Sequence, residues 1–208
     1  MDVFQWPSGH RVYIQPVIRG LESERAKVRQ ALAQSSAKTV ALSISKEELD
    51  GLKAYNGEET FPSNFEEEIY MEKLSAFGPV SKPPPCFLEA RDLAQTKGLK
   101  LESLDLDNVD FTEAYVSNVS TIEMMTQTWL EGRLRGRRFK AKTPEEFVVE
   151  FDKEINGKEG YRKLEEARER HMATRLIWLA KGSPATLALV ELERAEGVRQ
   201  GLAAYLPR

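Results

Sequence analysis

The stretch RVYIQPVIRGLESERAKVRQALAQSSAKTVALSI, residues 11–44, decides the fold class. Its two ends, at 11–17 and 39–44, are rich in β-branched and apolar residues and therefore predict strands. Between them, apolar residues recur on one helical face and charged residues fill the other, which predicts a helix over 21–34. A strand, a helix and a strand at this spacing form a βαβ unit with a right-handed crossover, so the two strands are expected to be parallel.

Short apolar segments predict two further strands, at 99–106 and 185–192. The residues around Phe4 and Trp6 precede a tight Ser-Gly turn, so this segment is expected to pair with the first strand. Helical periodicity occupies most of the remaining chain, and the helices that it predicts cover residues 46–56, 64–77, 86–97, 110–132, 144–155, 158–181 and 193–204.

Local signals place several of the predicted helix ends. Ser63 and Glu66 have the spacing of a capping box at the start of the helix over 64–77. Gly132 and Gly136 are expected to interrupt the long helical region that begins near residue 110.

The alternation of strands and helices predicts an α/β fold with a mainly parallel sheet flanked by helices. Residues 1–208 are expected to form a single domain, and the long helices within 110–182 are expected to form a helical lobe beside the sheet.

Composition and charge narrow the class of protein. Of the 208 residues, 41% are hydrophobic and 30% are charged, which is typical of a globular domain with a sizeable core. The net charge of −3 argues against a nucleic-acid-binding protein, because such proteins are usually basic. Residues 1–15 contain no signal-peptide core and no run is long enough to span a membrane, so a cytoplasmic protein without membrane segments is expected.

Cysteine and histidine are scarce. The single cysteine, Cys86, cannot form an internal disulfide, which fits a reducing compartment. Together with His10 and His171 it cannot build a structural zinc site made only of cysteine and histidine.

Ligands of open parallel sheets bind outside the carboxyl ends of the strands. The polar residues expected at these ends are Gln15, Arg19, Ser43, Ser45, Asp105, Asp107, Glu191 and Glu193. Asp105 and Asp107 are two residues apart, so on an extended chain their carboxylates point to one side. They are candidates for a hard-cation site or for acid–base chemistry, and the alternative is that they cap the following helix.

One arginine extends an apolar helix face. The helix predicted over 158–181 has Met172 and Leu176 on its apolar side, and Arg168 continues this side toward the N-terminus with Glu165 beside it. An inward guanidinium is either a snorkelling edge residue or an anion clamp.

The segment RLRGRRFKAK, residues 133–142, is strongly basic. It could meet phosphate, RNA or an anionic membrane surface, but it contains no recognisable nucleic-acid motif, and a solvated helix end explains it equally well. Met124, Met125 and Trp129 just before it are expected in the core, or in the interface of a homodimer if their face stays exposed.

Five segments resemble, in order, the sequence blocks of the TraB/PrgY family, which is related to the Tiki metalloproteases, erythromycin esterase and ChaN-like proteins. They lie within residues 11–201 and read VYIQPVIRGLESERAKVRQAL, TVALSISKEELDGL, PPPCFLEARDLAQTKGLKLESLDLDN, EARERHMATRL and ATLALVELERAEGV. The resemblance implies an erythromycin-esterase/ChaN-like α/β fold.

The chain departs from that family at the positions that the resemblance would make metal ligands or acid–base groups. Ile18 stands at the histidine of Gly-Thr-x-His, Ser43 at the strand-end glutamate, and Arg194 at the histidine of Gly-x-Gly-His. An aliphatic group has no lone pair, a guanidinium is permanently protonated, and a hydroxyl is a far weaker metal ligand than a carboxylate.

Of the remaining family positions, some agree with the family pattern and others differ from it. Gln15 stands at a family glycine and Leu106 at the arginine of Asp-Arg-Asp, whereas Asp105, Asp107 and Arg168 match the family.

The sequence therefore predicts a TraB-like domain that acts as a non-catalytic binding or regulatory protein. Its candidate ligand-binding residues are Gln15, Arg19, Ser43, Arg168 and Arg194. Neither a metal nor a cofactor is expected. The expected partner is a small anionic ligand or a protein, including a second copy in a homodimer.

The alternative is an enzyme, a metal-assisted hydrolase with a rearranged site at the carboxyl ends of the strands. Its divalent metal and its acid–base chemistry would depend on Asp105, Asp107, Glu191 and Glu193, with His10 or His171.

Overall fold

The computed structural model describes residues 1–57 and 64–205. Within these residues, five strands form one sheet in the order β1-β2-β5-β3-β4, with β1 antiparallel to β2 and the other neighbours parallel. The strands are β1 (Asp2–Gln5), β2 (Arg11–Val17), β3 (Thr39–Leu42), β4 (Lys100–Ser103) and β5 (Ala185–Glu191). The predicted α/β fold with a mainly parallel sheet is confirmed.

Helices occupy most of the other described residues. The α-helices are α1 (Glu24–Ser35), α2 (Lys46–Ala54), α3 (Phe65–Leu74), α4 (Pro85–Lys97), α5 (Asn108–Asn118), α6 (Thr121–Gly136), α7 (Pro144–Ile155), α8 (Glu159–Gly182) and α9 (Ala195–Ala203). Two short 3₁₀ helices, η1 (Ser75–Phe77) and η2 (Leu192–Arg194), follow α3 and β5.

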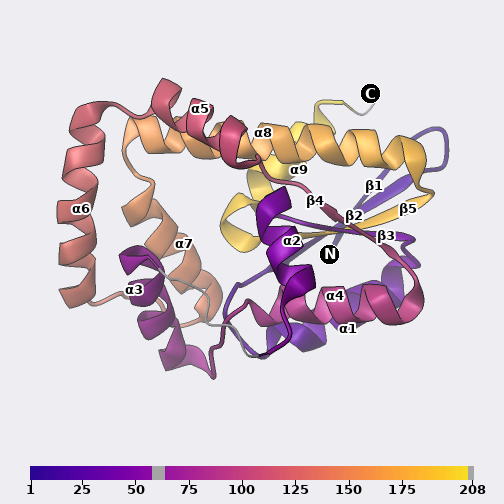
Figure 1. The fold of residues 1–208 in the computed structure, drawn as a ribbon, viewed down its shortest axis with the longest axis horizontal. Coiled ribbons are helices and arrows are strands. Elements are labelled where there is room, and N and C mark those ends of the chain that lie inside the picture. The colour runs from indigo at the N-terminus through magenta and orange to yellow at the C-terminus, as the bar shows by residue number, and fades with distance from the viewer. Residues whose placement is uncertain (58–63, 206–208) are drawn as a thin grey trace.

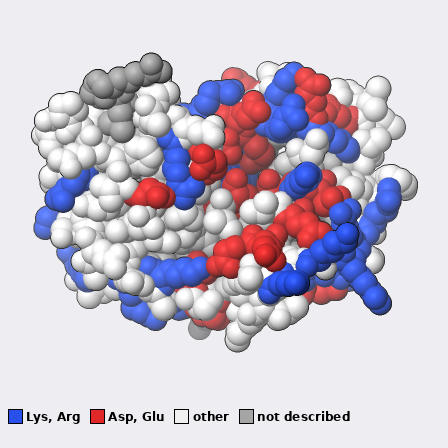
Figure 2. All heavy atoms as spheres, turned by 180° about the vertical axis from the view of Figure 1, so that it is seen from behind, with Lys and Arg blue, Asp and Glu red and all other residues white. Residues whose placement is uncertain are grey.

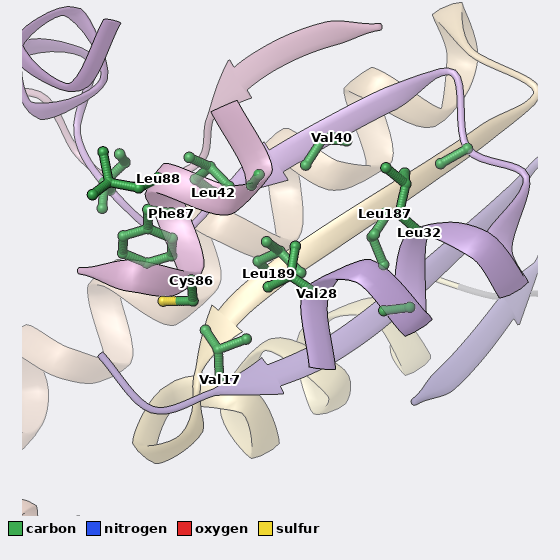
Figure 3. Close-up of a cluster of buried hydrophobic side chains, with 14 of the residues drawn as sticks. Val17, Val28, Leu32, Val40, Leu42, Cys86, Phe87, Leu88, Leu187 and Leu189 are labelled. Carbon is green, nitrogen blue, oxygen red and sulfur yellow. The ribbon is translucent and has the colours of Figure 1, made fainter. Parts of the chain in front are cut away.

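The sheet lies between two helical layers, with α1 and α4 on one face and α8 and α9 on the other (Figure 1). Every residue of the central strand β5 is buried, as expected for a strand covered on both faces. On the first face, Leu187 and Leu189 of β5 meet Val28 of α1 and Phe87 of α4 (Figure 3). On the second face, Met172 of α8 packs against the sheet. Packing between these two layers fixes the sheet, and the carboxyl ends of its parallel strands therefore lie along one edge.

The helices within 110–182 divide between two environments. Phe147 and Phe151 of α7 and Leu134 of α6 form a separate core with Tyr70 of α3, beside the sheet (Figure 1). Helix α8 runs from this region across the sheet, because its first half packs against α5 and its second half covers the strands (Figure 1). It therefore places side chains of its first half next to the strand ends.

The long helix predicted from residue 110 to 132 is divided at Ser120. The Ser120 hydroxyl accepts a hydrogen bond from the Glu123 N–H (3.3 Å), and the Glu123 carboxylate accepts one from the Ser120 N–H (2.9 Å). This capping box starts α6, which continues through Gly132 to Gly136. The expected break at Gly132 is wrong, because one exposed helical glycine costs only about 1 kcal/mol.

Two smaller predictions concern chain ends and caps. Strand β1 confirms the pairing expected around Phe4, while Trp6 lies after the strand, in the turn that closes the hairpin. Ser63 lies outside the described residues, and Asn64 caps α3 by accepting a hydrogen bond from the Glu67 N–H (2.8 Å).

None of the helices in the described ranges is long and apolar enough to cross a membrane.

Candidate functional site

The carboxyl ends of β2, β5, β3 and β4 lie along one edge of the sheet. The chain leaves β2 toward α1 and β3 toward α2 on one face, and it leaves β5 toward α9 on the other (Figure 1). Neighbouring connections thus diverge, and such points of an α/β sheet form a crevice suited to ligands. The charged residues found at this edge are Arg19, Asp105, Glu191, Glu193 and Arg194, with Glu165 and Arg168 contributed by α8.

Arg194 is the centre of this group. Its Nε lies 2.7 Å from Glu165 Oε2, its Nη1 lies 3.5 Å from Glu193 Oε1, and Nη1 also pairs with Glu191. Burial alone would disfavour the charged form, but the three carboxylates outweigh it and raise the pKa of Arg194 well above its ordinary value. The guanidinium is therefore a fixed positive charge at the end of β5.

Arg168 is turned inward and does not snorkel to solvent. Its Nε lies 3.1 Å from Asp105 Oδ2 and its Nη1 lies 2.8 Å from Glu165 Oε1. Its guanidinium also lies over the ring of Phe111, 5.6 Å from the centroid. Glu165 thus joins both guanidiniums, and although burial opposes its charge, Arg194 and Arg168 lower its pKa.

Glu193 is the carboxyl that is least compensated. Burial and the neighbouring Glu191 raise the pKa of Glu193 to about 7, against the opposing effects of Arg194 and Arg19. A carboxyl with this pKa can hold or release a proton near neutral pH.

Ile18 and Ser43 support the structure of the edge. The Ser43 hydroxyl accepts a hydrogen bond from the Glu191 N–H (3.0 Å) and so ties the end of β3 to the end of β5. The side chain of Ile18 is buried in the core beside the sheet, and its N–H donates to the buried carboxylate of Glu24 (3.2 Å). The sequence analysis did not select Glu24 as a candidate residue.

The two aspartates after β4 have different structural roles. Asp105 is buried, pairs with Arg168 and accepts a hydrogen bond from the Leu106 N–H (2.8 Å). Asp107 caps α5 by accepting from the N–H groups of Val109 (3.0 Å) and Asp110 (2.9 Å). Their carboxylates do not form a joint site, and in residues 1–57 and 64–205 no group of three or more His, Cys, Asp or Glu side chains could hold a metal ion.

Other candidates lie away from this edge. The Gln15 side chain donates to the carbonyl of Pro16 (2.8 Å), two residues before the last residue of β2. His10 immediately precedes β2 at the amino end of the strand, and His171 lies on α8 three residues beyond Arg168.

A cavity of about 450 Å³ opens beside the charged group. Ile44, Leu52 and Phe87 form its apolar wall. The polar residues around it are Arg19, Glu47, Glu48, Glu67, Lys82, Asn108 and Glu191, drawn from six separate segments of the chain. Sequence reasoning selected Arg19 and Glu191 from the strand ends but missed Lys82, which lies in a loop and matches no strand-end pattern.

The two cations of this cavity hold nitrogen atoms with unused donor capacity. Arg19 Nε lies 3.7 Å from Glu191 Oε1, and the guanidinium lies over the Tyr70 ring, 5.3 Å from the centroid. Lys82 Nζ lies 2.7 Å from Glu67 Oε2, outside hydrogen-bond geometry. Neither nitrogen makes a hydrogen bond in the part of the chain that the structure describes, although Lys82 Nζ keeps Glu67 as its ion-pair partner. Such donors favour an added acceptor.

A second hollow, of about 570 Å³, has Asp152, Glu165 and Glu169 in its lining. On the face that Figure 2 shows, Asp and Glu side chains gather in the middle. Burial first, and then Glu165, raise the pKa of Glu169 to about 7. Burial also raises the pKa of Asp152.

No protein-family model matches this chain, and no curated protein is significantly similar to it. The resemblance to the TraB/PrgY family therefore stays a prediction from the sequence.

Proposed function

We propose that this chain is a TraB-like domain without catalytic activity, and that it binds a small anionic ligand in the cavity beside Arg19 and Lys82. The single observation that carries the proposal is that two cationic side chains, Arg19 and Lys82, line the same 450 Å³ cavity. That volume lies in the range of small-molecule sites, which is roughly 300–1,000 Å³.

The cavity is lined by four carboxylates and two cations, so the case for an anion depends on how many of the carboxylates already have partners. Three carboxylates of the cavity already have partners: Glu191 pairs with Arg194, Glu67 with Lys82, and Glu48 accepts the Ser45 N–H at the start of α2 (2.8 Å). A guanidinium has five N–H donors and an ammonium has three, so the two cations can serve an added carboxylate or phosphate. The apolar wall supports a ligand with a short apolar part next to its anionic group.

The same edge supports the loss of catalysis. Arg194 occupies the end of β5 and pairs with Glu165, Glu191 and Glu193. Carboxylates neutralised in this way are poor ligands for a cation, because a metal ion would have to displace a guanidinium that is already desolvated.

A thermal-shift screen followed by calorimetry tests the proposal. The screen compares C2–C6 monocarboxylates, dicarboxylates and organic phosphates with amines and sugars of similar size. We expect an anion to raise the melting temperature, and Lys82→Met to weaken its binding at least tenfold. Lys97→Met is the matched control, since Lys97 is exposed at the end of α4. Binding of amines alone, or equal binding by both variants, would contradict an anion site.

The alternative function, a metal-assisted hydrolase, would use Glu193 as its general acid or base, because this carboxyl lies just after the end of β5 and burial beside Glu191 raises its pKa to about 7. Millimolar Mg²⁺, Mn²⁺ and Zn²⁺ should leave the melting temperature unchanged if our proposal is correct. Metal-dependent turnover of an ester, peptide or phosphoester that is abolished by Glu193→Gln, with the Glu113→Gln variant still active, would replace our proposal with this one.

A further inference from the structure

The outer face of α6 carries large apolar side chains that no described part of the chain covers. Ile122, Met125 and Trp129 are 75%, 73% and 66% exposed, and they follow one another at helical spacing. Arg133 continues this row, with its guanidinium 4.7 Å from the centroid of the Trp129 ring. We call these four residues the α6 face.

The basic segment that follows is compensated only in part. Arg137 is held by Glu154, and Arg135 lies 3.9 Å from Glu72. Among the described side chains, no ion pair joins a carboxylate to Arg133, Arg138, Lys140 or Lys142. Glu150 and Glu146 accept hydrogen bonds from the backbone N–H groups of Lys140 (3.0 Å) and Lys142 (2.7 Å). Figure 2 shows Lys and Arg gathered at the lower right, the corner where α6 ends. The remaining cations of this corner favour a partner that carries negative charge.

The geometry points to an anionic lipid surface as the partner of the α6 face. A helix that presents aliphatic residues and a tryptophan, next to several lysines and arginines, has the composition of an interfacial membrane-binding segment. In this arrangement the apolar row enters the boundary between headgroups and acyl chains, while the unpaired cations of residues 133–142 contact anionic headgroups. The face lies on the outermost helix of the molecule, so no other element prevents a flat surface from approaching (Figure 1).

Two other occupants fit less well. A nucleic acid would satisfy the cations but would offer nothing to the side chains of Ile122 and Met125. A second copy packed through the same face would cover the apolar row, but it would bring another set of unpaired cations in place of the missing negative charge. A membrane surface supplies both an apolar layer and negative charge.

Vesicle cosedimentation tests this inference on the full chain. We expect binding to vesicles of 70% phosphatidylcholine and 30% phosphatidylserine, little binding to pure phosphatidylcholine, and loss of binding in 0.5 M NaCl. Met125→Ser with Trp129→Ser, and separately Arg138→Gln with Lys140→Gln, should each reduce the bound fraction at least fivefold. Circular dichroism should show both variants folded, because all four side chains are at least half exposed or lie outside the core.

The chain contains a closely matched control. Trp178 of α8 is 60% exposed and lies beneath the guanidinium of Arg175, 4.9 Å from its ring centroid, so it repeats the Trp129–Arg133 pair on another surface. Trp178→Ser should leave vesicle binding unchanged. The inference would be overturned if vesicle binding depended equally on Trp129 and Trp178, or if it were the same with and without phosphatidylserine. A dimer in light scattering that Met125→Ser with Trp129→Ser dissociates, or retention by RNA in place of vesicles, would also overturn it.

Discussion

Arg194 Nε lies 2.7 Å from Glu165 Oε2, and this contact joins the end of the central strand β5 to helix α8. Glu165 is shared with Arg168, which reaches on to Asp105 after β4. The two guanidiniums therefore link the ends of two strands through a helix that crosses the sheet. This arrangement joins the strand ends through a set of largely buried ion pairs.

Replacing Arg194 should destabilise the protein strongly. Arg194→Met removes the partner of three buried carboxylates, and breaking a buried pair in this way costs about 3–5 kcal/mol. Urea unfolding at pH 7 measures the change in the free energy of unfolding. Arg199→Met is the control, because Arg199 pairs with Asp2 and Glu196 at the surface, where such pairs contribute about 0–1 kcal/mol. Similar losses in both variants would mean that the strand-end network is not buried in solution.

The pH dependence of stability should depend on Glu193. Its folded-state pKa is raised from 4.5 to about 7, so between these values the folded protein holds a proton that the unfolded chain has released. This contribution is fully present below pH 4.5 and is lost as the pH rises through 7, an effect of at most about 3 kcal/mol.

Urea unfolding at several values between pH 4.5 and 8 checks the effect of Glu193. Glu193→Gln should make the decline of stability with pH shallower, while Glu169, whose pKa is also about 7, keeps part of it. Glu113→Gln, at an exposed position on α5, should behave as the wild type does. An unchanged slope in Glu193→Gln would show that Glu193 is ionised throughout this range in the folded protein.

The sheet was largely predictable because its signals are local. The segments at 11–17, 39–44, 99–106 and 185–192 each contain one of the strands β2 to β5, since buried parallel strands need continuous apolar residues. The division of the helical region near residue 120 was missed, because helical periodicity resumes directly after Ser120 and a cap interrupts it for only two residues.

The candidate site was predictable only in part. The rule that ligands bind at strand ends selected Arg19, Asp105, Glu191 and Glu193 without any contact information. It could not show that Glu165 of α8 binds Arg194, since that contact depends on where a 24-residue helix crosses the sheet. Lys82 was missed for the same reason, because the packing of its loop against α3 is a tertiary property.

The packing of α9 on α8 should tolerate no added methyl group at Gly201. A Cβ at this position would lie 2.6 Å from the Cβ of Ala173, and both atoms are attached to helix backbone that cannot move alone. Gly201→Ala should cost about 1–3 kcal/mol in urea unfolding. Gly132→Ala, with open space around its new Cβ in α6, should instead stabilise by about 0.5–1 kcal/mol. Ala173→Gly added to Gly201→Ala should recover part of the loss, and strict additivity of the two changes would contradict the predicted contact.

The thiol of Cys86 should stay unreactive until the protein unfolds. It lies in the first turn of α4, where its side chain is fully buried (Figure 3), and burial, with smaller contributions from Glu24 and Glu191, raises the pKa of the thiol. Since the thiolate is the reactive form, labelling by a disulfide reagent such as DTNB at pH 8 requires both exposure and deprotonation. In increasing urea, the labelling rate should follow the unfolded fraction seen by circular dichroism. A cysteine placed at Lys97, exposed on the same helix, should react at once in the native protein. Native labelling of Cys86 at a comparable rate would show that α4 opens locally, and it would place the wall of the 450 Å³ cavity, to which Phe87 belongs, among the least stable parts of the fold.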